Sequence, residues 1–174
     1  HIIMKLPIIL YPAPSLQEPS KKVTDFKAAK KLIPDMIATM IAAKGIGLAA
    51  PQIGQNIRLA IIHKDADPTL KDHLVIINPK IFSASVEMDT EEEGCLSVPG
   101  ALGLVPRHRK IKVRFLDANG QEQKLKAVGL AARVLQHEID HLDGVLFIER
   151  ATKMIKGFWH IANFCLYLLS DYPY

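Results

Sequence analysis

The chain has 174 residues, of which 49% are hydrophobic and 23% are charged. These values fit a globular domain with a buried core, and they exclude a disordered or low-complexity chain. The formal net charge of +4 comes from scattered basic residues. It permits contact with an acidic partner such as RNA, but a solvated surface is the simpler interpretation, and we expect no specific nucleic acid as a partner.

Residues 1–3 precede Met4, which we interpret as the native start after a leader or a few added residues. We therefore expect a single domain over residues 4–174. The two cysteines, Cys95 and Cys165, make no disulfide framework, although one bridge between them stays open. The sequence shows no secretory signal and no apolar run long enough to span a bilayer. The expected compartment is a reducing cytoplasm, bacterial or of the kind inside organelles.

A helical pattern begins at Thr24 and ends at Gly45. Pro34 lies inside it, so the helix either kinks there or begins its regular part with Pro34 in the first turn. The apolar side chains form one stripe that we expect to face the core. They are Ile33, Met36, Ile37, Met40 and Ile41.

Residues 45–54 contain three glycines, two alanines and no charged residue. Such a stretch is not a solvated loop, and its backbone must pack closely against something. It is either a tight buried turn or a backbone edge offered to an extended ligand, with Gln52 as its lone polar side chain. It is not a phosphate-binding loop, because it lacks Gly-Lys-Ser/Thr.

Short runs rich in β-branched residues follow, and they predict strands at residues 57–62, 74–77, 81–88, 110–116 and 123–128. Asp117 to Gly120 is a hairpin turn signal between the last two runs. A second helical pattern continues from Gly129 through His141. The predicted fold is α+β, a single domain with short antiparallel or mixed strands around a central helix and with helices at both ends.

That central helix contains Gln-His-Glu-Ile-Asp-His at residues 136–141. His137 and His141 are four residues apart, so both imidazoles leave the same helix face and can hold one metal ion. Glu138 places a carboxylate beside such an ion, where hydrolysis needs a general base. The alternative is a helix with two surface histidines and an acidic neighbour.

A metal site of this kind needs a third ligand, which the residues after His141 do not supply. Phe147 stands where one class of zinc peptidases has a final histidine, and Glu149 is too close along the chain to fold back. The ligand must lie upstream, and Cys95 beside Gly94 is the candidate, since a thiolate and two imidazoles leave a fourth position for water. Taken alone, Cys95 would be interpreted as a small buried side chain.

Three stretches together resemble the signature of the peptide deformylases. They are Gly-Ile-Gly-Leu-Ala-Ala-Pro-Gln at residues 45–52, Glu-Gly-Cys-Leu-Ser at residues 93–97 and Gln-His-Glu-Ile-Asp-His at residues 136–141. Their order and spacing match the family, and the resemblance runs from about Ile8 to Arg150. It implies an α+β fold with the histidine motif on a central helix. It also implies hydrolysis of the formyl group from the N-terminal formyl-methionine of nascent polypeptides, with release of formate.

The resemblance implies that Cys95, His137 and His141 hold one divalent metal ion. Family members commonly hold Fe(II) natively and also bind zinc, nickel or cobalt. Glu138 resembles the catalytic carboxylate, which takes a proton from metal-bound water and returns it to the leaving amine.

The same resemblance supplies expectations for the substrate. Gln52 and the backbone N–H of Leu96 resemble donors to the oxyanion that develops during the reaction. Gly47 resembles the backbone partner of the peptide, which would add as a strand. The full set of substrate-binding residues expected is Gly45, Ile46, Gly47, Gly94, Leu130 and Val134, with Ile46, Leu130 and Val134 around the methionine.

The tail departs from the family, which in many members ends in a charged helix. Gly157 to Leu169 is apolar and too short to span a bilayer. It predicts a helix packed on the domain, or a homodimer contact or lid near the cleft. Cys165, within it, is interpreted as core packing. Docking of this tail on the ribosome is therefore in doubt, although the ribosome remains an open partner.

Some interpretations stay open. Arg107 is either a partner of the acids Glu91 to Glu93 or a plain surface arginine. Asp140 either orients a ligand or caps a neighbour. Two other classes of protein also remain: a metallopeptidase, whose later ligand is missing here, and a non-catalytic metal-stabilised binding protein, which would have no use for Glu138 or Gln52.

Overall fold

The computed structural model describes residues 2–157. Its helices are α1 (Phe26–Ala42), α2 (Leu130–Leu142) and α3 (Phe147–Arg150). Its strands are β1 (Gly47–Ala49), β2 (Leu59–Ile62), β3 (Leu74–Ala84), β4 (Met88–Cys95), β5 (Val98–His108), β6 (Lys110–Leu116), β7 (Glu122–Val128) and β8 (Lys153–Lys156). Short 3-10 turns lie at Pro14–Gln17, Ala50–Ile53 and Lys64–Ala66.

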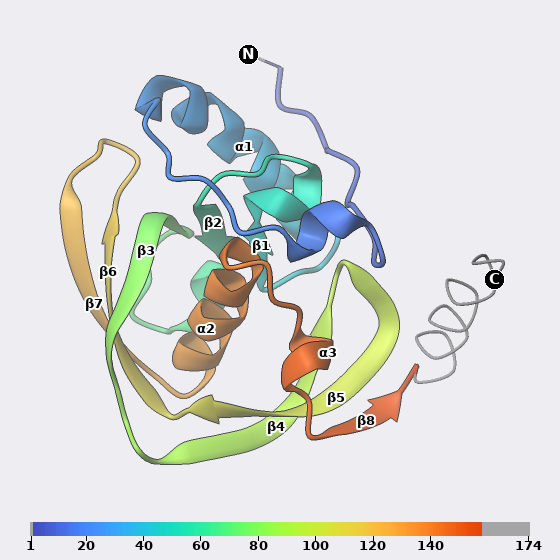
Figure 1. Ribbon diagram of the computed structural model, residues 1–174. Coiled ribbons are helices and arrows are strands. Elements are labelled where there is room, and N and C mark those ends of the chain that lie inside the picture. The colour runs from blue at the N-terminus through green and yellow to red at the C-terminus, as the bar shows by residue number, and fades with distance from the viewer. Residues whose placement is uncertain (1, 158–174) are drawn as a thin grey trace, which may run out of the picture.

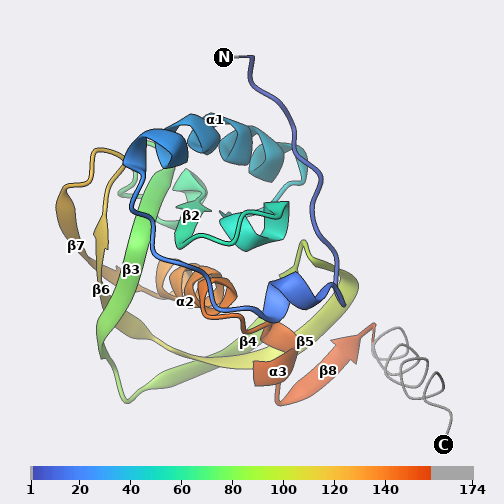
Figure 2. The same ribbon diagram turned by 45° about the horizontal axis from the view of Figure 1, so that its top comes forward.

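The strands form two antiparallel sheets around α2 (Figure 1, Figure 2). The larger sheet has the order β1-β2-β3-β6-β7, and the smaller sheet has the order β4-β5-β8. This arrangement confirms the predicted α+β class, with antiparallel strands around a central helix.

Strand β2 of the larger sheet is buried on both faces because a helix packs on each side of it. On β2, Leu59 and Ile61 join the cluster formed with α1, whereas Ala60 and Ile62 join the cluster formed with α2. These alternate positions follow from the two-residue repeat of a strand. Helix α2 is buried along nearly its whole length, so its polar side chains must find partners inside the protein.

Helix α1 begins at Asp25, whose carboxylate accepts a hydrogen bond of 2.9 Å from the Ala28 N–H. The suggestion that Pro34 lies in the first turn is wrong, because the helix starts eight residues earlier and carries Pro34 in its interior. Burial of the apolar stripe compensates for the missing donor. Ile41, predicted to face the core, is 51% exposed, because it lies one residue round from buried Met40.

The predicted strands at residues 74–77 and 81–88 are one strand, β3, which ends at Ala84. Asn78 has a φ of 51°, and the register shifts between Ile77 and Lys80. A bulge therefore absorbs the Asn78-Pro79 step that the sequence pattern marked as a break.

Strands β4, β5 and β8 were not predicted. An acidic run fills β4, and glycines and prolines interrupt β5, so both have low intrinsic strand propensity. Pairing between the strands decides their structure instead, from Met88 opposite His108 to Cys95 opposite Val98.

The hairpin turn predicted at Asp117 to Gly120 is confirmed, since the Asp117 N–H donates to the Gln121 carbonyl oxygen at 2.9 Å. Among residues 2–157, no helix is long and apolar enough to cross a membrane. The predicted tail helix and Cys165 lie outside the described residues, as does the end of the domain predicted at residue 174.

Candidate active site

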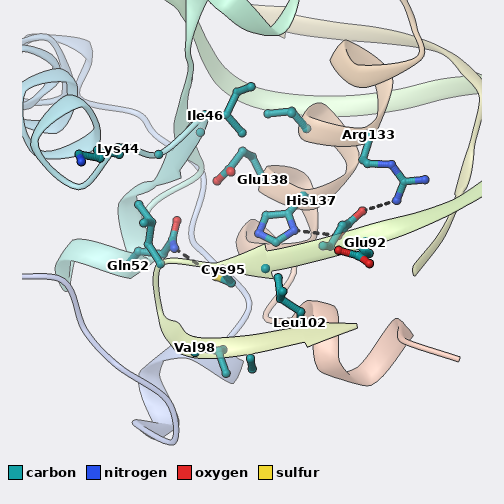
Figure 3. Close-up of a pocket in the computed structure, with 18 of the residues that line it drawn as sticks. Lys44, Ile46, Gln52, Glu92, Cys95, Val98, Leu102, Arg133, His137 and Glu138 are labelled. Carbon is teal, nitrogen blue, oxygen red and sulfur yellow. Dashed lines mark hydrogen bonds and ion pairs between the residues drawn. The ribbon is translucent and has the colours of Figure 1, made fainter. Parts of the chain in front are cut away.

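Helix α2 carries the side chains of His137, Glu138 and His141 into the interior. Figure 3 shows the first two. The rings of His137 and His141 have centroids 4.9 Å apart, as expected for two residues one turn apart on a helix. Glu138 is 3% exposed and His141 is 1% exposed. The alternative of two surface histidines is therefore wrong.

Cys95 ends strand β4 and brings a free thiol to the same place. Its Sγ lies 3.2 Å from His141 Nε2, and the candidate ligand atoms of Cys95, His137 and His141 all lie within 4.8 Å of one another. Thiolate and imidazole ligands stand about 2.0 to 2.3 Å from an ion such as zinc. Three donors this close together fit one metal ion.

Glu93 fixes the orientation of His137. Its Oε2 accepts a hydrogen bond of 3.0 Å from His137 Nδ1, which leaves the other ring nitrogen for a metal. Arg107 donates two hydrogen bonds to this carboxylate, at 2.9 and 3.0 Å, and Arg133 donates one at 2.7 Å. Burial alone would raise the pKa of Glu93, but the hydrogen bonds from His137 and Arg107 hold it at about 2.

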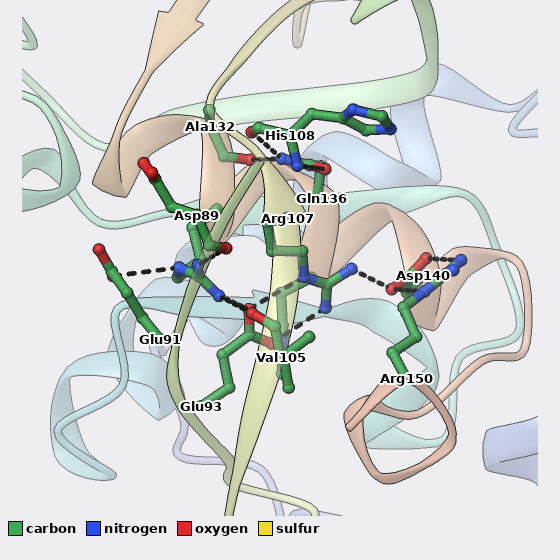
Figure 4. Close-up of polar contacts among 12 residues, drawn as sticks. Asp89, Glu91, Glu93, Val105, Arg107, His108, Ala132, Gln136, Asp140 and Arg150 are labelled. Carbon is green, nitrogen blue, oxygen red and sulfur yellow. Dashed lines mark hydrogen bonds and ion pairs between the residues drawn. The ribbon is translucent and has the colours of Figure 1, made fainter. Parts of the chain in front are cut away.

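Arg107 continues this network to Asp140 (Figure 4). Arg107 is 4% exposed, so its interpretation as a surface residue is wrong. Asp140 accepts from Arg107 at 2.5 Å and from Arg150 at 2.5 and 2.6 Å. The ion pairs therefore join β4, β5, α2 and α3, and they hold the helix with the two histidines against the strand that carries Cys95.

Glu138 lies against the backbone of β1. A Cβ on Gly47 would stand 2.7 Å from the carboxyl carbon of Glu138 and closer still to its Oε1, so glycine leaves the room that this carboxylate needs. Burial raises the pKa of Glu138 to about 7. Its Oε2 has no hydrogen-bond partner among the described residues. A carboxylate in this state is suited to exchange a proton near neutral pH.

Gln52 is held at both ends of its amide group. Its Oε1 accepts from the Ala49 N–H at 2.9 Å, and its Nε2 donates to Ser97 Oγ at 3.1 Å and to Cys95 Sγ at 3.5 Å. Leu96 lies in the turn after β4, outside the ladder that β4 forms with β5, so its N–H is available to a ligand. Both candidate donors thus lie next to Cys95.

These groups border a cavity of about 530 Å³ between β1, α2 and the β4–β5 hairpin (Figure 3). The predicted site residues that line it are Gly45, Ile46, Gly47, Gln52, Gly94, Cys95, Leu96, Leu130, Val134, His137 and Glu138. Within the stretch at residues 45–54, residues 47–53 are buried, as expected for a tightly packed segment, and β1 is the edge strand of the larger sheet. That this edge is offered to an extended ligand stays a prediction.

Sequence reasoning missed several residues that shape this site. Glu93 was considered only as a partner of Arg107, and its bond to His137 was missed, as was the bond of Ser97 to Gln52, because these partners come from distant segments. Arg133 is four residues before His137 on the same helix face, and that spacing was a usable signal. Leu102 and Lys156 line the cavity from β5 and β8, which the sequence did not predict.

A thiolate and two imidazoles beside a buried carboxylate, with N–H donors at the same cavity, make up the site of a metal-dependent hydrolase. Comparison with known proteins narrows this class. The family profile described as polypeptide deformylase matches residues 5–156. A peptide deformylase of Prochlorococcus marinus (strain MIT 9312) is 46% identical over 138 residues, which cover 79% of this chain and 69% of the relative.

Solved structures give the same result. A peptide deformylase from Synechococcus elongatus in complex with actinonin is 42% identical with a TM-score of 0.79, covering 85% of this chain and 79% of that one. A class I type b peptide deformylase from Acinetobacter baumannii with bound Met-Ala-Ser is 34% identical with a TM-score of 0.80, covering 86% of this chain and 99% of that one.

The chain belongs to the polypeptide deformylase family. It removes the formyl group from N-formylmethionyl peptides. The family uses a divalent metal ion, for which this chain offers the Cys95, His137 and His141 set. The metallopeptidase interpretation is thereby set aside.

Proposed function

We propose that deformylation occurs here at one divalent metal ion held by Cys95, His137 and His141, with Glu138 as the group that moves the proton. The observation that carries this proposal is the Glu138 carboxylate. It is buried, it lines the same cavity as Cys95 and His137, and its Oε2 has no protein partner among the described residues. A carboxylate that served only the fold would be expected to have partners for both oxygens.

The donor set favours a transition metal over magnesium or calcium, since those ions prefer oxygen ligands. We propose Fe(II) as the native ion, with zinc, nickel or cobalt able to replace it. When bound, the ion supplies Lewis acidity and lowers the pKa of water in the site. The chain itself holds the ligands in place, through Glu93 on His137 and through the ion pairs of Arg107.

Glu138 acts first as base and then as acid in this proposal. It accepts a proton from the attacking water and returns it to the amine that leaves as the formyl carbon–nitrogen bond breaks. General acid–base catalysis of this kind contributes about 10² to 10⁴ in rate. The close approach that Gly47 permits fixes where the carboxylate stands.

The negative charge that develops on the formyl oxygen needs donors, and we assign this role to the Gln52 side chain and the Leu96 N–H. Gln52 is preorganised because Ala49 and Ser97 both bond to its amide group. A donor placed in this way is worth about 3 kcal/mol of transition-state stabilisation.

The peptide would add to β1 as an extra strand. β1 is at the edge of the larger sheet, so one side of its backbone is free to pair with an extended chain. Main-chain pairing tolerates any sequence after the first residue. The methionine side chain would lie among Ile46, Leu130 and Val134, while Gly45 and Gly94 let the backbone approach closely. The Met-Ala-Ser bound to the Acinetobacter baumannii relative supports a peptide at this site.

A cytoplasmic location is part of the proposal, because Cys95 must remain a reduced thiol to act as a ligand. A catalytic domain that includes the whole of residues 4–174, and contacts of the tail with the ribosome or with a second copy, stay predictions.

Replacement of Glu138 by Gln tests the proposal. We expect Glu138→Gln to keep the fold and the metal content, while formate release from a formyl-methionyl peptide falls by roughly 10² or more. Glu92→Gln is the matched control, because Glu92 lines the same cavity but lies outside the motif of α2. Equal turnover in the wild type and in Glu138→Gln would instead assign Glu138 a structural role.

A further inference from the structure

Strands β3, β6 and β7 carry a group of cations on one face of the larger sheet. In the register of the sheet, Arg114 on β6 stands opposite Lys80 on β3 and opposite Lys124 on β7. Lys112 on β6 stands opposite Lys126 on β7 in the next row of the same face. All of these side chains are exposed. We call them the basic sheet face: Lys80, Lys112, Arg114, Lys124 and Lys126.

The burial pattern of β6 shows which way this face points. Ile111, Val113 and Phe115 are buried in the cluster formed with α2. Lys112 and Arg114 alternate with them, so they point away from α2 and from the metal-ligand residues. β7 is the edge of the sheet (Figure 1). None of the basic sheet face lines the catalytic cavity.

Such an arrangement is unfavourable in the free protein. Like charges directly opposite each other on neighbouring strands destabilise a sheet. Here three such oppositions occur together: Lys80 with Arg114, Arg114 with Lys124, and Lys112 with Lys126. Glu122, the acid at the end of the same face, stands opposite Leu116 and makes no ion pair within residues 2–157.

The arginines elsewhere in the molecule are arranged differently. Each other arginine within residues 2–157 has a carboxylate partner, in the pairs Arg58 with Asp143, Arg107 with Glu93 and Asp140, Arg109 with Glu87, Arg133 with Glu91 and Glu93, and Arg150 with Asp140. Arg114 alone among the described arginines has none, and its neighbours across the strands are lysines. This distribution indicates that the counter-charge comes from another molecule.

We propose that the basic sheet face binds the phosphate backbone of RNA. Contacts between lysine or arginine and phosphate do not depend on the base sequence, and the release of counterions from the nucleic acid favours binding. Figure 1 shows β6 and β7 as a twisted ribbon, and the register of the sheet places these cations along it. A twisted row of cations suits a curved phosphate backbone better than a flat membrane surface. The exposed apolar residues nearest in sequence are Phe82 on β3 and Val128 on β7, each two residues from a lysine of the face. Binding to anionic vesicles is therefore the competing outcome that the experiment must separate from binding to RNA.

The two sites can be occupied together, because the basic sheet face lies on the opposite side of the sheet from α2. RNA binding at this face would hold the enzyme on an RNA surface while the cavity stays open to peptides. The proposal concerns the phosphate backbone and is independent of the roles assigned to the metal ligands.

Fluorescence anisotropy with labelled oligouridine and the metal-loaded full chain would test this inference. The face variant carries Lys112→Gln, Arg114→Gln, Lys124→Gln and Lys126→Gln. The control variant loses the same charge from exposed lysines elsewhere and carries Lys27→Gln, Lys31→Gln, Lys71→Gln and Lys153→Gln. Formate release from a free peptide should stay unchanged in both variants, which shows that both are folded.

We expect the wild type and the control variant to bind oligouridine with a steep salt dependence. In the face variant, the slope of log affinity against log salt should fall by roughly 3, since each lost phosphate contact removes about 0.7. Equal weakening in both variants would overturn the proposal in favour of net charge alone. Unchanged oligouridine binding in the face variant would also overturn the proposal. So would a face variant that no longer binds phosphatidylserine vesicles but still binds oligouridine as tightly as the wild type.

Discussion

Replacement of Gly47 by Ala should remove activity through a single methyl group. The new Cβ would stand 2.7 Å from the carboxyl carbon of Glu138 and nearer to Oε1. Non-bonded atoms do not approach so closely, so the carboxylate must retreat by about 1 Å, a displacement that can cost about 10² in rate. Overpacking should also cost about 1 to 3 kcal/mol of stability.

The control for this prediction is Gly103→Ala. A Cβ on Gly103 would stand 2.9 Å from the Ala151 Cβ and 3.0 Å from the Met154 Sδ. It would therefore also overpack the protein, but it would not contact Glu138. Turnover in formate release, metal content and thermal unfolding should be measured for both variants. We expect Gly103→Ala to lose stability and keep its turnover. If Gly47→Ala turned over as fast as the wild type, the inference that Gly47 positions Glu138 would be refuted.

Two further substitutions probe charges away from the chemistry. Glu93→Gln should destabilise the protein by about 3 to 5 kcal/mol in denaturant titrations, because Arg107 and Arg133 lose a buried charged partner. The folded pKa of Glu93 is about 2 against 4.5 ordinarily, so its stabilisation is complete above pH 4.5 and is lost as the pH falls toward 2. In the metal-free proteins, the wild type should lose stability between about pH 4.5 and 2, and Glu93→Gln should lack this loss. The same loss of stability in both proteins would contradict the role given to Glu93. Lys126→Glu should raise the free energy of unfolding at low salt by about 0.2 to 1 kcal/mol, because it places a negative charge directly opposite Lys112. Lower stability would argue against repulsion on that face.

The central helix and the chemistry of the site were predictable from the sequence, because their signals are local. The four-residue spacing of His137 and His141 fixes their common helix face whatever surrounds them. Glycine at positions 45 and 47 likewise indicated close packing, although it did not show that Glu138 is the group packed against Gly47.

The β4–β5 hairpin was not predictable in this way. The pairing of Arg107 with one of Glu91 to Glu93 was one of two interpretations of the sequence and is confirmed for Glu93, but the second partner, Arg133, and the burial of Glu93 follow only from the fold. Strand β3 was split for a related reason, since Asn78 and Pro79 are breaking residues that a bulge can absorb. In both cases contacts between distant segments outweigh local propensity.

The most direct test of the proposed metal centre measures metal content and formate release on the same anaerobic preparation. We expect about one transition metal ion per chain, since residues 2–157 contain one three-residue ligand set, and formate release in proportion to metal loading. Cys95→Ala should lose both the metal and the activity, whereas Cys165→Ala should keep both. Formate release by the Cys95→Ala protein at the wild-type rate, or with its full metal content retained, would contradict the proposed ligand set.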